Sequence, residues 1–298
     1  MVLHEHIYQA TKEEHKEHGC SITDLCRLGR VSGAAYHKWL HREIPENEHK
    51  NRRIADEIEK IHTESPDKGY RRIRDDLERY HGITVIDKRV LRICRKLHMK
   101  STIKYSNHGC TRQAANPQYI AENILNREFT AAAPNEKRLT DVTEFHHYIG
   151  SVKQKVCLSA VLDLYDRRIV SYVIRDHHNN ALVSDTVDEA IRLNPKSHPL
   201  FHSDRGFQYT NRAFHSKLAA AGITQSMSRV AKCIDNGPME GFWGILKRER
   251  YYGKRFKEKE TLVKMIEDYI DYYNNKRLQR GLGVLTPMEK HEFYLHAA

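Results

Sequence analysis

Three acidic residues that are far apart in the chain stand at positions suited to binding divalent cations. Asp141 lies within the β-forming run Leu139-Thr140-Asp141-Val142-Thr143, where a carboxylate is unusual unless it faces an opening or a metal ion. Asp204 ends the short run Phe201-His202-Ser203, and Glu240 lies on a helix predicted from residue 237 onward. Carboxylates are the protein ligands that Mg²⁺ prefers. The trio is therefore a candidate site for two Mg²⁺ ions, with Mn²⁺ as a substitute, which is the pair that phosphoryl transfer between nucleic-acid ends uses.

The helix that carries Glu240 is predicted to have two distinct faces. The residues expected to pack inward, at helical spacing, are Met239, Phe242, Trp243 and Leu246. Glu240, Gly244 and Lys247 share the adjacent face at the same spacing. That face offers a metal ligand, a position with no side chain to obstruct a substrate, and a cation one turn further along.

The elements around these residues follow a definite order. Runs rich in Val, Ile, Thr and Tyr predict three strands at Leu139–Tyr148, Val156–Leu164 and Ile169–Ile174, with a hairpin between the last two. Helices and strands then alternate, at residues 181–193, 200–202, 211–221 and 223–226. This is the element order of a ribonuclease-H-like α/β fold, in which a mixed sheet is flanked by helices.

Small all-α units are expected ahead of the sheet. Ser21 and Ser32 are candidate N-caps of two short helices separated by a turn, a helix-turn-helix-like pattern. Pro45-Glu46-Asn47-Glu48 is interpreted as a linker, and the amphipathic helix 51–61 follows it, with Ile54, Ile58 and Ile61 on one side.

The chain is accordingly divided into five segments. A helix near Tyr119–Leu125 is expected in the third, and a long helix with Val263, Ile266, Tyr269, Ile270 and Tyr273 on its core face in the last. The segments are a helix-turn-helix-like unit at 1–45, a second, basic helix-turn-helix-like domain at 46–107, a linker at 108–135, the ribonuclease-H-like core at 136–250 and a C-terminal helical extension at 251–298.

Positive charge is concentrated where a nucleic acid could lie. The net charge is +11, and residues 46–107 carry 16 Lys and Arg against 11 Asp and Glu. In the helix predicted at 87–97, the face made of Val90, Leu91, Cys94 and Leu97 is expected to be inward. Arg89, Arg92 and Lys96 share the opposite face, which suits DNA phosphates. The alternative, a solvated helix face, is disfavoured by the regional surplus of positive charge.

A second cationic stretch follows the helix of Glu240. Residues 250–257 interleave Arg250, Lys254 and Arg255 with tyrosines and a phenylalanine, a composition typical of contacts with phosphates and unstacked bases. An amphipathic connector is an equal alternative.

The six cysteines are scattered and contain no C-x-x-C pair, so we expect reduced thiols. His15, His18, Cys20 and Cys26 crowd together, but they lack the paired spacing of a zinc finger. Surface histidines on a polar helix are the favoured interpretation.

Four sequence blocks carry a resemblance to a known family. Thirty-five residues separate Asp204 from Glu240, and Asp204 lies in His202-Ser203-Asp204-Arg205-Gly206-x-Gln208-Tyr209. Asp235-Asn236 precedes Glu240, and the tail contains Tyr273-Asn274-x-x-Arg277 and Leu285-Thr286-Pro287-x-Glu289. In this order the blocks resemble the OrfB-type transposases of the insertion-sequence-three family, within the DDE transposase and retroviral integrase superfamily. The likeness covers nearly the whole chain.

The resemblance implies the catalytic subunit of a transposase. The three acidic residues would bind the metal ions, and Lys247 would reach the bound DNA end. Arg205, beside Asp204, is a further candidate DNA contact. The family often has Trp three residues before its first aspartate, whereas this chain has Arg138, which affects local packing and not the metal site.

Other carboxylates compete for the role of ligand. Asp163 and Asp166 are interpreted as hairpin residues, although Asp163 is the best substitute ligand. Glu144 is interpreted as a strand-face residue, Asp235 as a helix cap, and Glu249 as part of a charged surface. Only the joint spacing of the chosen trio raises it above these neighbours.

The predicted reaction is metal-dependent nicking at the ends of an insertion sequence. The exposed 3′-OH then attacks a phosphodiester directly, because no Ser, Tyr or Cys motif is placed as a nucleophile. Two rival functions are a helix-turn-helix regulator with an inert sheet domain, which lacks nicking activity, and a nuclease or ribonuclease H, which cuts without joining.

The expected partners are the element's terminal inverted repeats and target DNA. By analogy with the family, bringing two ends together suggests at least a homodimer, and the family's separate upstream OrfA-type protein is a candidate second partner. No run of eighteen apolar residues occurs, and Met1-Val2-Leu3-His4-Glu5 has no apolar signal core. We therefore expect no membrane association and a cytoplasmic protein, nucleoid-associated when bound to DNA.

Overall fold

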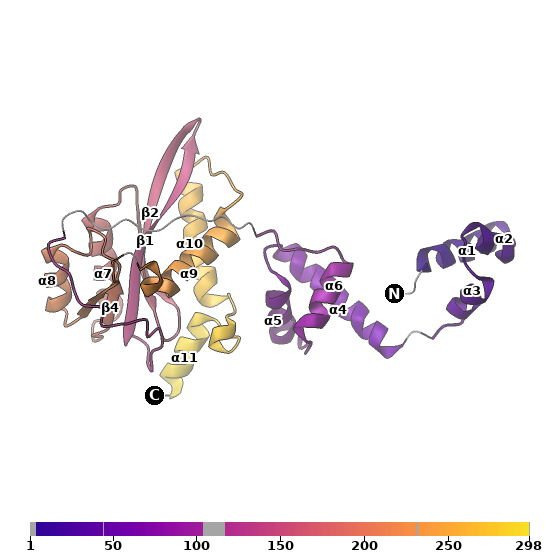
Figure 1. Ribbon diagram of the computed structural model, residues 1–298, viewed down its shortest axis with the longest axis horizontal. Coiled ribbons are helices and arrows are strands. Elements are labelled where there is room, and N and C mark those ends of the chain that lie inside the picture. The colour runs from indigo at the N-terminus through magenta and orange to yellow at the C-terminus, as the bar shows by residue number, and fades with distance from the viewer. Residues whose placement is uncertain (1–3, 44, 104–116, 231, 298) are drawn as a thin grey trace. The chain divides into compact units, whose positions relative to one another are not determined.

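The computed structural model describes residues 4–43, 45–103, 117–230 and 232–297. The chain divides into two compact units, Met1–Ser101 and Thr102–Ala298 (Figure 1). The first unit is helical, and the second contains a mixed sheet covered by helices. Among the described helices, none is both long enough and apolar enough to cross a membrane.

The first three helices enclose a small aromatic core. They are α1 (Glu5–His18), α2 (Ile22–Leu28) and α3 (Gly33–Leu40). Ser21 and Ser32 occupy the predicted N-cap positions, but neither side chain makes a capping hydrogen bond. Cys26 is buried in this core with Tyr8 and Tyr36.

The histidines and cysteines near the first helix show no arrangement around a metal ion. The His15 Nδ1 atom lies 2.8 Å from the carbonyl oxygen of Cys20. The cysteines whose side chains the structure describes, Cys20, Cys26, Cys94 and Cys157, are free thiols. Cys110 and the side chain of Cys233 lie outside the described part.

Three more helices form the second helical core of this unit. They are α4 (Glu46–Glu64), α5 (Tyr70–His81) and α6 (Asp87–Lys96). Ile54, Ile58 and Ile61 are buried there, as their spacing predicts. The prediction of a linker at residues 46–48 is wrong, because α4 begins at Glu46. Glu46 and Glu48 stand in its first turn, where negative charge stabilises the helix dipole.

The sheet of the second unit has five strands in the order β3-β2-β1-β4-β5. The strands are β1 (Lys137–Ile149), β2 (Val152–Asp163), β3 (Ile169–Arg175), β4 (Leu200–Ser203) and β5 (Thr224–Met227). β1, β2 and β3 are antiparallel, whereas β4 pairs in parallel with both β1 and β5. This topology is ribonuclease-H-like, and it confirms the predicted fold class.

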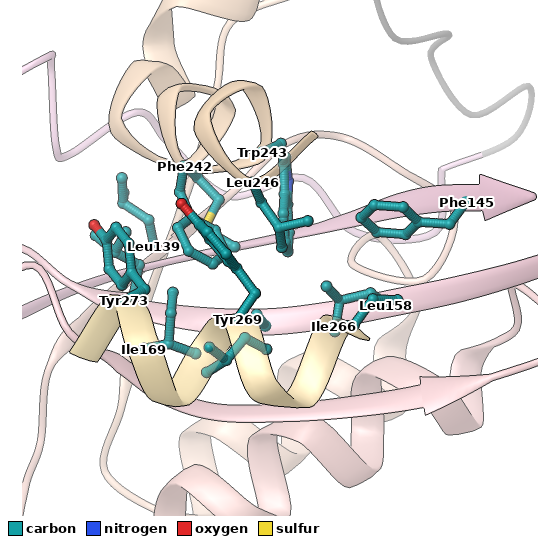
Figure 2. Packing of buried hydrophobic residues seen from close by; sticks show 14 of the residues in the cluster. Leu139, Phe145, Leu158, Ile169, Phe242, Trp243, Leu246, Ile266, Tyr269 and Tyr273 are labelled. Carbon is teal, nitrogen blue, oxygen red and sulfur yellow. The ribbon is translucent and has the colours of Figure 1, made fainter. Parts of the chain in front are cut away.

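Helices cover both faces of the sheet (Figure 1). On one face, α7 (Asn180–Leu193) and α8 (Arg212–Ala220) pack through residues such as Val187 and Phe214. On the other face, α9 (Gly237–Leu246) and α10 (Lys259–Asn275) bury the larger core against β1 and β2. Figure 2 shows Phe242, Trp243 and Leu246 of α9 in the same core as Tyr269 and Tyr273 of α10.

The inward faces predicted for α9 and α10 are largely confirmed. Met239, Phe242, Trp243 and Leu246 are all buried. On α10, Ile266, Tyr269, Ile270 and Tyr273 are buried, Val263 is partly buried, and Leu262 joins them. The sheet and both helices therefore share one hydrophobic core.

The predicted helix near Tyr119–Leu125 is absent from these described residues, which follow the edge of the sheet in an irregular, extended path. The carbonyl oxygen of Glu122 accepts a hydrogen bond from the backbone N–H of Met227, at 3.2 Å. The Ser226 hydroxyl accepts hydrogen bonds from the backbone N–H groups of Ile124 and Leu125, at 3.0 and 3.2 Å. β5 is an edge strand, so this segment covers polar groups that would otherwise lack partners.

The tail ends in α11 (Pro287–Ala297), which has a reciprocal cap at its start. The Thr286 hydroxyl accepts a hydrogen bond from the backbone N–H of Glu289 at 3.1 Å, and the Glu289 carboxylate accepts one from that of Thr286 at 3.0 Å. This capping box explains the spacing of Thr286-Pro287-x-Glu289 in physical terms.

Candidate active site

Asp141 lies in the middle strand of the sheet. Its Cα atom is paired with that of Ala160 on β2, and its carboxylate is half-buried. The Oδ2 atom accepts a hydrogen bond from the indole N–H of Trp243, at 3.0 Å. Burial raises the pKa of Asp141, and the nearby negative charges of Asp204 and Glu240 raise it further.

Asp204 is brought beside Asp141 by the parallel pairing of β1 and β4. In that register Leu139 is opposite His202, and Asp141 and Asp204 each stand two residues further along. Asp204 directly follows β4, and its Oδ1 atom accepts the backbone N–H of Gly206 at 2.9 Å. Burial raises the pKa of the Asp204 carboxyl.

Glu240 comes from the first turn of α9, and its side chain is exposed. The start of this helix is tied to β1, because the Asn236 side-chain amide donates to the carbonyl oxygen of Thr140 at 3.1 Å. Thr140 is the residue before Asp141. Partial shielding of the Glu240 carboxyl from water by the neighbouring protein raises its pKa, and the charge of Asp204 raises it further.

The three predicted acidic residues therefore lie close enough to affect one another's pKa. Their carboxylate oxygens are the donors that a hard divalent cation prefers, so the residues present fit Mg²⁺ chemically. Within the described ranges, no three His, Cys, Asp or Glu side chains already form a binding group around one ion. The elements of the fold bring the three carboxylates near one another, but the carboxylates do not form a closed coordination shell.

Lys247 lies next to this acidic group. Its ammonium is 5.1 Å from the centre of the Phe145 ring. Burial lowers the pKa of Lys247, while Asp141 and Glu144 act in the opposite direction. Lys247 is the first residue of a π-helical turn, Lys247–Tyr251, that continues α9. Such turns are frequent at functional sites.

Two neighbours of the acidic group were missed as site residues in the sequence. Trp243 was expected only to pack inward, and no pattern indicates that its N–H reaches Asp141. His178, between β3 and α7, lies near enough to Asp204 for the two charges to interact. Its buried Nε2 atom has no hydrogen-bond partner among the described residues. Neither contact has a local sequence signal, because each joins elements distant in the chain.

The competing carboxylates have structural partners. The oxygens of Asp163 accept hydrogen bonds from the backbone N–H groups of Asn135 and Tyr165, at 2.7 and 2.8 Å. Asp163 is also paired across the strands with Arg138, which is almost fully buried and hydrogen-bonded to Asn135. Burial lowers the pKa of Arg138 to about 10, and Asp163 counteracts this. The carboxylate of Asp163 thus lies near enough to the buried Arg138 guanidinium for their charges to interact.

The helix-cap interpretation of Asp235 is wrong. Asp235 is fully buried in a 3₁₀ turn, Cys233–Asn236. Its carboxylate accepts hydrogen bonds from Arg229 at 2.8 Å and Arg127 at 2.6 Å. The hydrogen bond from Arg229 is the main cause that lowers the pKa of Asp235. This residue anchors the loop that leads into α9.

The surface interpretation of Glu249 is also wrong. Glu249 is buried, and its carboxylate accepts hydrogen bonds from Arg277 at 2.8 Å and from the Tyr269 hydroxyl at 2.9 Å. Glu144, by contrast, lies on the strand face as expected, 2.9 Å from the Lys155 ammonium.

The candidate DNA contacts near the site differ in the contacts that they make within the protein. Arg205 Nε donates to the carbonyl oxygen of Ser228 at 2.7 Å. Arg250 lies 5.4 Å from the centre of the Tyr272 ring, and Arg255 lies 4.6 Å from that of Tyr148. Lys254 is exposed.

The aromatic residues of the stretch 250–257 largely pack within the protein. Phe256 is buried, and Tyr251 stacks on it with ring centres 5.8 Å apart. The Tyr251 hydroxyl accepts the backbone N–H of His146 at 2.9 Å. This favours the amphipathic-connector alternative for the aromatic rings. Lys254 and Arg255 are the exposed cations among the three candidates in this stretch.

The basic face of α6 is partly as predicted. A shallow depression on its surface is lined by Lys88, Leu91, Arg92, Arg95 and Lys96. Arg89 instead turns toward α4, where its Nε donates to Asn51 Oδ1 at 2.9 Å. The inward prediction for Leu91 is wrong, because Ile93 takes the buried position beside Val90 and Cys94.

Known proteins that resemble this chain are integrases and transposases. Profiles described as integrase core domains match residues 131–233 and 240–292, and one described as an HTH-like domain matches residues 48–106. A protein of Escherichia coli (strain K12), named InsK for the insertion sequence element IS150, is 34% identical over 270 residues. The match covers 90% of this chain and 92% of that protein.

Two further similarities are more distant. The transposase InsF for insertion sequence IS3A, also from Escherichia coli (strain K12), is 26% identical over 280 residues, which is 90% of this chain and 92% of that one. A structure of the HTLV-2 integrase catalytic core domain in complex with magnesium is 19% identical, with a TM-score of 0.40. It covers 54% of this chain and 98% of that chain.

Proposed function

Because the chain belongs to the insertion-sequence-three family of transposases, which are DDE polynucleotidyl transferases, we propose that Asp141, Asp204 and Glu240 are its catalytic residues. The enzyme would cut the ends of an insertion sequence and join the exposed 3′-OH to target DNA. The observation that carries this assignment is the β1–β4 register, which sets Asp141 beside Asp204 at the end of β4.

The reaction has two steps, and neither needs a covalent protein intermediate. Water attacks a phosphodiester at the element's end and releases a strand with a free 3′-OH. That hydroxyl then attacks a target phosphodiester, so one P–O bond forms as another breaks. Two bound Mg²⁺ ions would activate the attacking oxygen and stabilise the leaving one.

Each group of side chains around the site has its own proposed role. The three carboxylates would hold the cations, and Glu240 offers an exposed carboxylate on α9. Lys247, at the end of the same helix, neutralises a phosphate of the bound DNA end. Asn236 and the Gly206 turn keep α9 and the end of β4 in place through their hydrogen bonds.

Removing divalent cations is expected to abolish both cleavage and joining. Adding back Mg²⁺ should restore both, and Mn²⁺ should substitute for it. The measurement is a gel assay on a labelled duplex that carries the element's terminal repeat, with DNA binding in EDTA as the control. Nicking without joined products would instead favour a nuclease. Full activity in EDTA would contradict the metal assignment.

The face of α6 is proposed to bind DNA phosphates through Arg92, Arg95 and Lys96. Arg92→Ala with Lys96→Ala is expected to weaken DNA binding and to lower the slope of log affinity against log salt by about 0.9 for each lost contact. Lys264→Ala, on the exposed face of α10, removes a charge elsewhere and serves as the control. A salt slope equal to that of the unaltered protein would contradict this interface.

Two proposals concern assembly. Joining two ends in one event requires at least two subunits on the DNA, so the active form is proposed to be a dimer or larger. The separate upstream protein of the family is a proposed partner in recognising the element's ends. Light scattering of the protein with and without end DNA measures the number of subunits in the assembly directly.

A further inference from the structure

Trp243 makes a contact that its packing role does not require. Among the residues of α9, all of which the structure describes, it is the one buried side chain that carries a hydrogen-bond donor. It is 6% exposed, and its ring lies 5.1 Å from that of Phe242 (Figure 2). A buried indole N–H needs an acceptor, and here the acceptor is Asp141 Oδ2 at 3.0 Å.

This hydrogen bond is one of two that connect α9 and its start to β1. The second runs from the Asn236 side-chain amide to the carbonyl oxygen of Thr140, at 3.1 Å. Glu240 lies between Asn236 and Trp243 along the chain. The two bonds therefore fix α9 against β1 on both sides of Glu240, and they act on adjacent residues of the strand.

The same bond also orients the carboxylate. With Oδ2 held by the indole, rotation of the Asp141 carboxyl group is restricted, and Oδ1 keeps a defined direction. We propose that Trp243 is a positioning residue, which orients Asp141 and sets its spacing to Glu240 for binding of divalent cations. This inference rests on the proposed function of the trio.

The loss of metal affinity expected without Trp243 is the loss typical of other metal sites. Removing a partner that orients a ligand weakens metal affinity or activity by about 10- to 100-fold. Trp243→Phe keeps an aromatic ring in the core and removes the N–H. Its Mn²⁺ affinity, measured by isothermal titration calorimetry on the full chain, is expected to fall by about this factor. DNA binding in EDTA should stay unchanged.

The chain contains two tryptophans, which makes a matched control available. Trp39→Phe makes the same substitution in the small aromatic core of the first unit and should leave Mn²⁺ affinity unchanged. Two indole N–H resonances are therefore expected in a ¹⁵N–¹H spectrum, and the Trp39→Phe spectrum assigns them. Titration with Mg²⁺ should shift the Trp243 resonance and leave the Trp39 resonance in place. The spectral test uses the unaltered protein, so it holds even where Trp243→Phe fails to fold.

Asp141→Asn separates failure of this inference from failure of the proposed function. Weakened Mn²⁺ binding in Asp141→Asn together with unaltered binding in Trp243→Phe would overturn the positioning role alone. A Trp243 resonance that does not move at saturating Mg²⁺ would overturn it too. Unaltered Mn²⁺ binding in Asp141→Asn, Asp204→Asn and Glu240→Gln would overturn the proposed site itself.

Discussion

Glu240→Gln is expected to abolish both cleavage of the element's ends and joining to target DNA. The amide keeps the size of the side chain but removes the negative charge that a divalent cation needs. Metal ions contribute several kcal/mol of charge stabilisation in the transition state, so we expect a loss on the order of 10³-fold or more. Asp141→Ala and Asp204→Ala should behave alike. The rates are measured on labelled end duplexes with Mg²⁺ in excess.

Glu292→Gln on α11 is a matched control, because it makes the same exchange away from the three carboxylates. It should retain full activity. All the variants should bind end DNA nearly as well as the unaltered protein. A Glu240→Gln protein that cuts and joins in Mg²⁺ at the normal rate would falsify the assignment of Glu240.

Local sequence patterns were sufficient to predict most elements of the second unit. A run rich in β-formers predicted β1, and spacing of three and four residues predicted the buried face of α9. The pairing of β1 with β4 is different, because it joins segments about sixty residues apart in the chain. No local pattern specifies such a register. The choice of Asp141 and Asp204 therefore relied on the spacing of motifs, and their metal-binding role stays a prediction.

Two of the errors have a common physical cause. Residues 119–125 have an apolar, helix-compatible composition, but their backbone groups form hydrogen bonds with the edge strand β5 instead of those of a helix. Glu249 stands among Lys247, Arg248 and Arg250, and its neighbours in sequence indicate a surface position. Its partner Arg277 is 28 residues away, beyond α10. In both cases a distant segment determines the environment of the residue.

The pair of Glu249 and Arg277 also links the tail to the turn that follows α9. Glu249 lies in the π-helical turn that begins at Lys247, and Arg277 follows α10. Burial acts to lower the pKa of Arg277, but Glu249 outweighs this effect and the pKa is raised. The pair fixes the π-helical turn that begins at Lys247.

Arg277→Ala is expected to lower the free energy of unfolding by about 3–5 kcal/mol, because it leaves the Glu249 carboxylate buried without its cation. Chemical denaturation followed by tryptophan fluorescence measures the change, since Trp243 lies in the same unit. Asp268→Ala breaks an exposed pair with Lys264 on α10 and should cost at most about 0.5 kcal/mol.

Replacing both partners separates the loss of an ion pair from the burial of a lone charge. Glu249→Met combined with Arg277→Met should recover much of the stability lost in Arg277→Ala, because no charge is then left in the core. The double variant should still join DNA more slowly than the unaltered protein, since the turn at Lys247 loses its anchor. Equal loss of stability in Arg277→Ala and Asp268→Ala would show that the buried pair does not hold the tail to the turn that follows α9.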